Sequence, residues 1–111
     1  MKHKRTLATE IPPEVKAIVW ERDDHKCIFC RRYVPMFFAN AHYIKRSQGG
    51  LGIPENIFTA CDRCHREEDA GKNSLKYRDI AKKHLQEKYP SWDEEKLYYK
   101  KGMDLDERLQ N

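Results

Sequence analysis

Long apolar runs are absent from this sequence. No hydrophobic stretch approaches the roughly 20 residues that a helix needs to cross a bilayer. The basic start, residues 1–5, is not followed by the apolar segment of a secretion signal. These two absences argue against a membrane partner and against export, so we expect a cytoplasmic protein.

Hydrophobic residues are scarce as well. They make up 39% of the chain, below the roughly 45–50% of a typical globular protein, while charged residues make up 36%. Much of the chain must therefore be solvated surface, and the core of a single domain of 111 residues is thin. A structural metal would stabilise such a domain. Low-complexity tracts are also missing.

Acidic residues are slightly fewer than basic residues. The chain has 22 Lys and Arg residues against 18 Asp and Glu residues, which gives a net charge of +4. This charge is compatible with a nucleic-acid partner, but many soluble proteins carry as much. The charge alone therefore leaves the partner open.

The N-terminal part of the chain predicts an arm followed by a helix. Residues 1–10 begin with several basic side chains and read as a flexible basic arm. Pro12 and Pro13 suit the first turn of a helix, where a missing N–H does no harm. The apolar spacing that follows predicts a helix ending near residues 23–24.

The middle of the chain predicts two strands and a helix. Residues 36–44 are rich in aromatic and apolar side chains and favour a strand, and residues 57–60 favour a second, shorter one. The glycine-containing segment 45–54 between them predicts a loop. A helix is expected over residues 62–70, with Gly71 placed to end it. The predicted class is α+β, with a ββα unit.

The C-terminal part predicts two further helices. Apolar residues recur at helical spacing over residues 73–89, and Pro90 should stop that helix. Ser91 and Glu94 match a capping box for a last short helix through Tyr99. The expected organisation is an arm over 1–10, a domain over 11–101 with a core at 25–71 and a helical extension at 73–101, and a tail over 102–111.

Four cysteines form two C-x-x-C pairs. In a reducing cytoplasm such pairs favour a metal site over disulfides. Each pair supplies two thiolates from one tight turn, and four thiolates complete tetrahedral zinc with no open position for a substrate. We therefore expect a structural zinc; the alternatives are a redox C-x-x-C motif and four unrelated cysteines. The expected ligands are Cys27, Cys30, Cys61 and Cys64.

Three polar residues, His42, Asn56 and His65, lie within or just after this cysteine frame. The stretches that contain them resemble the HNH endonuclease family, and most of all its small phage-type members. The stretches are Ala41-His42-Tyr43-Ile44, Ser47-Gln48-Gly49-Gly50, Glu55-Asn56-Ile57 and Cys64-His65. The resemblance covers residues 12–71 and extends more loosely to about residue 101. It implies a ββα-metal (His-Me finger) nuclease core with flanking helices.

The resemblance also implies catalytic roles. His42 would be the general base, which an ordinary histidine pKa of about 6.5 suits at neutral pH. Asn56 would hold His42 in place by hydrogen bonds across the loop. His65 would bind a catalytic Mg²⁺, Mn²⁺ or Ni²⁺ ion, with Asp69 on the same helical face and Glu68 as a further candidate. The alternatives are a histidine satisfied by backbone bonds, a turn asparagine and a solvated acidic patch.

The chain departs from the family at Ala41. Many members carry an Asp or His metal ligand immediately before the general base, and an alanine cannot bind a metal. Basic residues near the motif are expected to contact DNA phosphates without reading bases. They are Arg31, Arg32, Lys45, Arg46, Arg63 and Arg66.

The function implied by this resemblance is a metal-dependent DNA endonuclease that leaves 5′-phosphate and 3′-hydroxyl ends. A phage origin within a bacterial cell, and a role in DNA processing or packaging beside terminase subunits, follow by analogy alone. A monomer is expected, with a dimer as the alternative. Two rival functions stay open: a non-catalytic zinc module that binds DNA or a protein, and a nuclease of host defence or of a mobile element.

Overall fold

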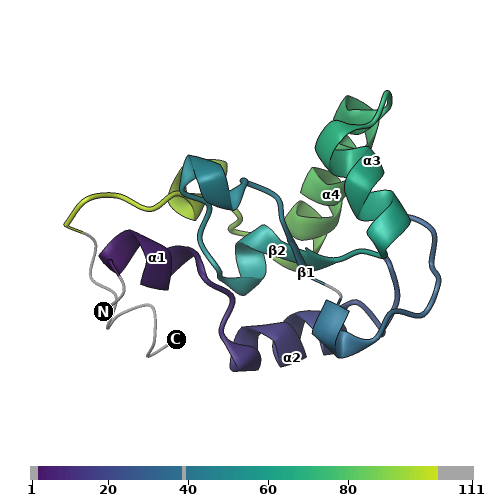
Figure 1. The fold of residues 1–111 in the computed structure, drawn as a ribbon, viewed down its shortest axis with the longest axis horizontal. Coiled ribbons are helices and arrows are strands. Elements are labelled where there is room, and N and C mark those ends of the chain that lie inside the picture. The colour runs from purple at the N-terminus through teal and green to yellow at the C-terminus, as the bar shows by residue number, and fades with distance from the viewer. Residues whose placement is uncertain (1–2, 39, 103–111) are drawn as a thin grey trace.

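A computed structural model describes residues 3–38 and 40–102 of the chain. Its centre is a two-stranded antiparallel sheet of β1 (Asn40–His42) and β2 (Ile57–Thr59), in which Ala41 lies opposite Phe58. Figure 1 shows α2 (Pro13–Arg22) on one side of the sheet, and α3 (Asp62–Ala70) and α4 (Ser74–Lys88) on the other. The expected α+β class is confirmed.

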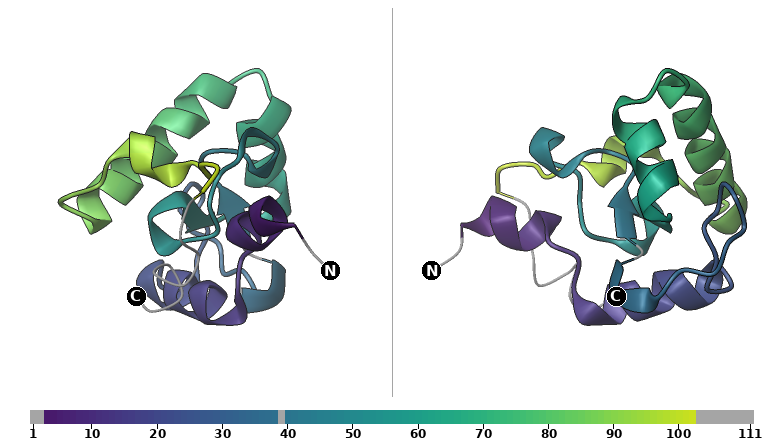
Figure 2. Two further views of the ribbon diagram at one scale, coloured as in Figure 1. Left: turned by 90° about the vertical axis from the view of Figure 1, so that its left-hand side faces the viewer. Right: turned by 45° about the vertical axis from the view of Figure 1, so that its right-hand side comes forward.

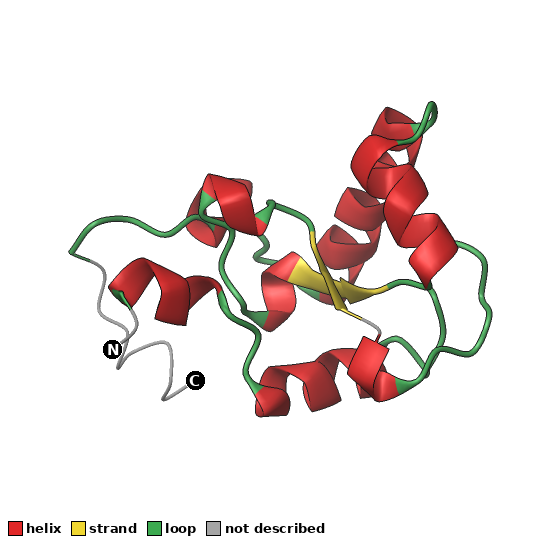
Figure 3. Ribbon diagram, in the orientation of Figure 1, coloured by secondary structure: helices red, strands yellow, loops and turns green. Residues whose placement is uncertain are grey.

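Helix α2 forms where the prolines predicted it. Pro13 takes the first helical position, where its fixed φ favours the helix. Val15 and Val19 are buried four residues apart and pack with Ile57 of β2. This apolar face fixes α2 against the sheet. Figure 3 colours helices and strands differently, and α2 and the two strands can be followed in it.

Most of the core lies on the opposite face of the sheet. Phe58 is fully buried there and meets the ring of Phe29 edge-on, with ring centroids 5.6 Å apart. Leu85 of α4 and Leu97 belong to the same apolar cluster. A fully buried side chain of this size contributes about 1.5–3 kcal/mol by leaving water, so this small cluster holds the C-terminal half on the sheet.

Helices α3 and α4 form a hairpin with its turn at residues 71–73, visible from two sides in Figure 2. Gly71 ends α3 as expected, but its φ of −77° is not left-handed. A Cβ at this position would lie 2.7 Å from the backbone oxygen of Glu67. Glycine is therefore required by close packing. Helix α4 ends at Lys88, two residues before Pro90.

The expectation of a flexible arm over residues 1–10 is wrong for the described part. Lys4–Thr9 form helix α1, and Ala8 and Thr9 are buried. The N–H of Gly52 donates to the carbonyl of Ala8 at 3.0 Å, and a Cβ on Gly52 would lie 1.7 Å from the carbonyl oxygen of Glu10. The backbone at the end of α1 and just after it therefore packs closely against the glycine loop. The basic composition of residues 1–10 gives no indication of this contact.

Two other element predictions need correction. Met36–Phe38 form a 3₁₀ turn, η1, closed by a bond from Phe38 N–H to the Pro35 carbonyl, so the first strand begins only at Asn40. The last helix is the 3₁₀ segment η4 (Glu94–Leu97), whose cap is Asp93 and not Ser91. Residues 103–111 of the expected tail lie outside the described residues.

Among the described helices, none combines the length and the apolar character that crossing a membrane requires.

Candidate metal centre and active site

The four cysteine sulfurs converge on one point. All four Sγ atoms lie within 4.8 Å of one another, and all four cysteines are free. The Sγ atoms of Cys30 and Cys61 are 3.8 Å apart. Zn–S bonds of about 2.3 Å place tetrahedral sulfurs about 3.8 Å apart, so this separation fits a metal such as zinc. The expected four-cysteine cluster is confirmed.

Local backbone geometry builds this cluster. In the first turn, Cys27 N–H donates to Arg32 at 2.8 Å and Arg31 N–H donates back to Cys27 at 3.0 Å, with Arg31 at a φ of +66°. Cys61 is the N-cap residue of α3, so Cys64 lies in the first helical turn. A bond of 3.0 Å from Ile28 N–H to the Thr59 carbonyl joins the two turns.

The thiols of this cluster change one another's pKa, and not all in the same direction. Burial, and then the neighbouring thiol of Cys61, raise the pKa of Cys64 far above its ordinary value. Burial also raises the pKa of Cys27. Burial acts the same way on Cys30, but the Arg32 backbone and the adjacent thiols outweigh it and lower its pKa to about 7. Four thiolates this close require a cation to offset their repulsion.

His42 lies at the end of β1, half-buried, with its Nε2 atom 2.8 Å from the carbonyl oxygen of Thr9. A carbonyl oxygen can only accept, so Nε2 carries the proton and Nδ1 keeps its lone pair. Burial lowers the pKa of His42, and the charges of Arg46 and His65 lower it further, against the bond to Thr9. The ring is therefore a neutral base at neutral pH.

His65 is exposed on α3, directly after the cysteine ligand position Cys64. It is close enough to His42 to act on that residue's pKa, and it also acts on the carboxyl groups of Glu68 and Asp69. The structure therefore brings His42 and His65, which are far apart in sequence, close enough for their charges to interact.

Asn56 is fully buried and bonds across the glycine loop. Its Nδ2 donates to the carbonyls of Ile44 at 3.1 Å and Leu51 at 2.9 Å, and its Oδ1 accepts the N–H of Ile44 at 2.8 Å. These bonds close both ends of the loop. They fix the backbone two residues after His42, and no hydrogen bond joins the amide to the imidazole among the described contacts.

The carboxylates proposed as metal ligands are already paired. Glu68 is buried, with Oε1 3.1 Å from Arg78 Nη1; burial raises its pKa and Arg78 opposes the rise. The Asp69 side chain is 56% exposed, and its Oδ1 lies 3.0 Å from Lys45 Nζ, which lowers the pKa of Asp69. Asp69 is thus accessible to an ion and Glu68 is not.

His65, Glu68 and Asp69 do not form a ready-made metal cluster. Within the described part of the chain, the four cysteines are the only group of three or more such side chains close enough to hold an ion. Ala41 offers no substitute, because it is 2% exposed and belongs to the core cluster. Side chains alternate along a strand, so residues 41 and 42 point to opposite faces of the sheet. A metal-binding side chain at position 41 would therefore point into the core, away from His42.

The six basic residues expected at DNA have different surroundings. Lys45 is paired with Asp69, and the Arg46 guanidinium lies 3.2 Å from the hydroxyl of Thr9. Arg31 is exposed. The other three are exposed around one cleft beside the cysteine cluster, of about 400 Å³: Arg32, Arg63 and Arg66.

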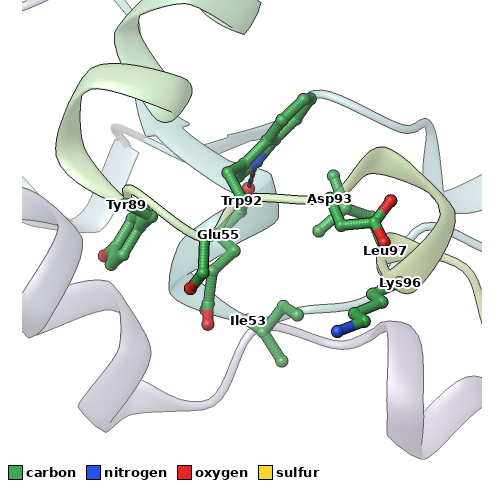
Figure 4. A pocket seen from close by; sticks show the side chains of 8 residues that line it. Ile53, Glu55, Tyr89, Trp92, Asp93, Lys96 and Leu97 are labelled. Atoms are coloured by element: carbon green, nitrogen blue, oxygen red, sulfur yellow. Dashed lines mark hydrogen bonds between the residues drawn. The ribbon is translucent and has the colours of Figure 1, made fainter.

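A second cavity, of about 180 Å³, lies where the chain returns after α4 (Figure 4). Trp92 forms one wall and donates its indole N–H to the carbonyl of Glu55 at 2.7 Å. Glu55 belongs to η3 (Pro54–Asn56), the turn that carries Asn56. The C-terminal segment therefore supports the turn that positions Asn56.

A buried ionic network is centred on Asp23, and the sequence did not predict it. Asp23 accepts bonds from Arg22 at 2.8 and 3.0 Å, from His84 at 2.8 Å and from the backbone N–H of Thr59 at 2.9 Å. His84 thus links α4 to the end of α2 and to β2. The adjacent Arg22-Asp23 pair was the available signal, but nothing local pointed to a histidine 61 residues away.

Replacing Asp23 with asparagine should destabilise the protein by about 3–5 kcal/mol, because it leaves the buried Arg22 guanidinium without its carboxylate partner. Burial opposes ionisation of Asp23, but His84 and Arg22 outweigh it and hold its pKa well below the ordinary value. The stabilisation is present above the unfolded-state pKa of about 3.9 and declines as the pH falls below it. Urea unfolding at pH 7 and at lower pH measures both effects.

Asp24→Asn is the matched control for this change. Asp24 is the next residue, is exposed, and has a φ of +58° that asparagine tolerates. It should change stability by less than about 0.5 kcal/mol. Equal stability of the Asp23 and Asp24 variants would contradict the network's role.

No family model, curated protein or solved structure matches the chain. The fold and the site together define a small α+β domain with a cluster of four cysteines that can hold a metal.

Proposed function

We propose that the protein is a metal-dependent DNA endonuclease of the HNH type, with a zinc ion held by the four cysteines. The main support is the state of His42. Its Nε2 is bonded to the Thr9 carbonyl and its pKa is lowered, so Nδ1 is free to accept a proton. His65, whose charge acts on His42, directly follows a cysteine of the cluster, and the family resemblance implies a metal ligand at that position.

Zinc suits the four sulfurs because thiolates are soft ligands and the set is complete. Its role is structural. A divalent ion at the exposed His65 and Asp69 would supply charge neutralisation at the phosphate and at the leaving oxygen. Two protein ligands are enough where phosphate oxygens and water complete the coordination, as is common for Mg²⁺.

The side chains and backbone of the protein would carry out proton transfer, positioning and phosphate binding. His42 Nδ1 takes a proton from the attacking water, whose oxygen bonds to phosphorus. The P–O3′ bond breaks, and the 3′ oxygen takes a proton from a solvent water to become a hydroxyl while the phosphate stays on the 5′ side. His42 returns its proton to solvent. The Thr9 carbonyl holds the imidazole tautomer, and Asn56 holds the end of β1. Exposed arginines and Arg46 add affinity for the backbone.

The proposal predicts that supercoiled plasmid is nicked only in the presence of a divalent ion. Purified protein should be assayed with Mg²⁺, Mn²⁺ or Ni²⁺ after dialysis into metal-free buffer, with Zn²⁺ alone as the control for the structural site. Cleavage with one or more of the three ions and none with Zn²⁺ alone is expected. Ends that accept ligation directly would identify 5′-phosphate and 3′-hydroxyl products.

A non-catalytic zinc module that binds DNA or a protein is the second candidate. The pairing of Glu68 with Arg78 and of Asp69 with Lys45 favours it, because both carboxylates have partners without a metal. Absence of cleavage with every ion, together with DNA binding, would select this candidate.

The biological setting proposed is a phage-encoded enzyme in a bacterial cell that processes or packages DNA with terminase subunits. Its support is the likeness to phage-type sequences. A nuclease of host defence or of a mobile element would have the same chemistry, and the neighbouring genes distinguish these roles.

A further inference from the structure

The cleft beside the cysteine cluster combines aromatic rings with positive charge. It has a volume of about 400 Å³ and lies between the first cysteine turn, η1 and the start of α3. Its walls include Tyr33, Phe38, Arg32, Arg63 and Arg66. Nothing in the proposed chemistry at His42 uses the two rings.

Both rings are open to solvent. Tyr33 is 62% exposed and Phe38 is 74% exposed. Tyr33 is held in place by an edge-on contact with Trp20, whose ring centroid is 6.5 Å away. Apolar ring surface gathered in a cleft and left in water is typical of a binding site, and the face of a ring is the part that stacks on a planar ligand.

The charge of the cleft selects an anion. Three guanidinium groups line it against one carboxylate, that of Asp62. Arg63 also interacts with the sulfur of Cys64, so Arg32 and Arg66 are the groups free of the cysteine cluster. Guanidinium groups bind phosphate oxygens, and aromatic rings stack on bases whatever their sequence. The two together match a nucleotide.

The cleft also adjoins the candidate active site. Arg66 directly follows His65 on α3, and consecutive helical residues point about 100° apart. β1, which carries His42, begins two residues after the η1 turn that carries Phe38. A DNA strand at His42 and His65 can therefore extend into the cleft. A base can stack on Phe38 or Tyr33 only after it leaves its neighbours in the duplex.

We propose that this cleft binds an unpaired nucleotide, with its base on the Phe38 and Tyr33 rings and its phosphate at Arg66 and Arg32. If the protein is the proposed nuclease, this cleft makes DNA with a single-stranded segment its preferred substrate, and that part of the inference rests on the proposed function. Binding itself does not require catalysis, so the two can be tested apart.

The test compares single-stranded and double-stranded DNA in metal-free buffer without chelator, which preserves the zinc and prevents cleavage. Fluorescence anisotropy would measure Kd for a labelled oligothymidylate and for a duplex of equal length. Phe38→Ala should weaken binding of the single strand roughly 5- to 150-fold, the range expected for one stacked base. It should leave duplex binding nearly unchanged.

The chain provides matched controls for both interactions. Phe37 is 77% exposed in the same η1 turn but does not line the cleft, so Phe37→Ala should leave Kd unchanged. Arg66→Gln should weaken single-strand binding and Arg31→Gln, outside the cleft, should do so less. Equal effects of Phe38→Ala and Phe37→Ala, or equal losses on single strand and duplex, would overturn the inference.

Its failure is distinguishable from failure of the nuclease proposal. Binding of the single strand that depends on Phe38, with no plasmid cleavage under any ion, supports the cleft and removes the nuclease. Plasmid cleavage that depends on His42, with no effect of Phe38→Ala on single-strand binding, removes the cleft and leaves the nuclease.

Discussion

His42→Ala should reduce the rate of metal-dependent DNA cleavage by roughly 10²- to 10⁴-fold, the usual contribution of a general base. The reason is specific to the ring's surroundings. The Thr9 carbonyl fixes the proton on Nε2 and burial keeps the ring neutral, so the lone pair on Nδ1 is the proton acceptor. Single-turnover plasmid cleavage, with DNA binding measured in parallel, tests this effect.

Two further variants separate catalysis from folding. The imidazole of His42 also anchors α1, because Thr9 is the last residue of that helix. His42→Gln places an amide N–H near the position of Nε2 and so keeps a donor for that carbonyl, but it supplies no base, so it should fold as the wild type does and remain inactive. His3→Ala changes an exposed histidine and should retain full activity. Cleavage by His42→Gln at the wild-type rate would exclude the proposed base.

The pH profile of the same reaction follows from the lowered pKa of His42. A lowered pKa means that the neutral, proton-accepting form persists below the ordinary histidine value of about 6.5. Activity should therefore rise with pH through a midpoint below about 6.5 and then level off.

Cys27→Ser, which removes one sulfur ligand, should abolish zinc binding and unfold the domain. Structural zinc contributes roughly 10–16 kcal/mol in small zinc-binding peptides, as much as the whole stability of many domains. Cys27 is fully buried beside the other sulfurs, so a serine there leaves an incomplete ligand set in the core. Metal analysis by mass spectrometry and circular dichroism would measure both losses.

The wild-type protein supplies the control for this change. A strong zinc chelator should unfold it, and added zinc should restore the fold, which excludes an effect of the serine itself. Native thiols should be unreactive toward thiol reagents, whereas a redox C-x-x-C motif would react. A folded Cys27→Ser protein that contains no zinc would refute the structural role.

Sequence patterns of short range predicted much of the fold. Pro13 begins α2, Gly71 ends α3 and Pro90 follows α4, because each acts on the backbone within a few residues. The two C-x-x-C spacings predicted the four-sulfur cluster for a related reason, since each pair needs only one tight turn. Composition failed at residues 4–9, where a basic segment forms a helix through contacts with a distant glycine loop.

The roles of His42, Asn56 and His65 stay predictions that the family resemblance implies. The pairing of Glu68 with Arg78 could not be foreseen from the sequence. Such a pair depends on how α3 and α4 pack, and the local sequence does not specify that angle. The Thr9 carbonyl gave no signal, because every residue offers the same backbone oxygen.

The sequence by itself determined the cysteine cluster and the positions of α2, α3 and α4, and it supplied the residues that we propose as base and ligands. Only the tertiary structure decided how those residues are held. The bond from His42 to Thr9 spans 33 residues and that from His84 to Asp23 spans 61. Turns and caps are set by neighbouring dihedral angles and ligand chemistry, whereas the tautomer of His42 and the ionisation of Asp23 depend on packing between distant segments.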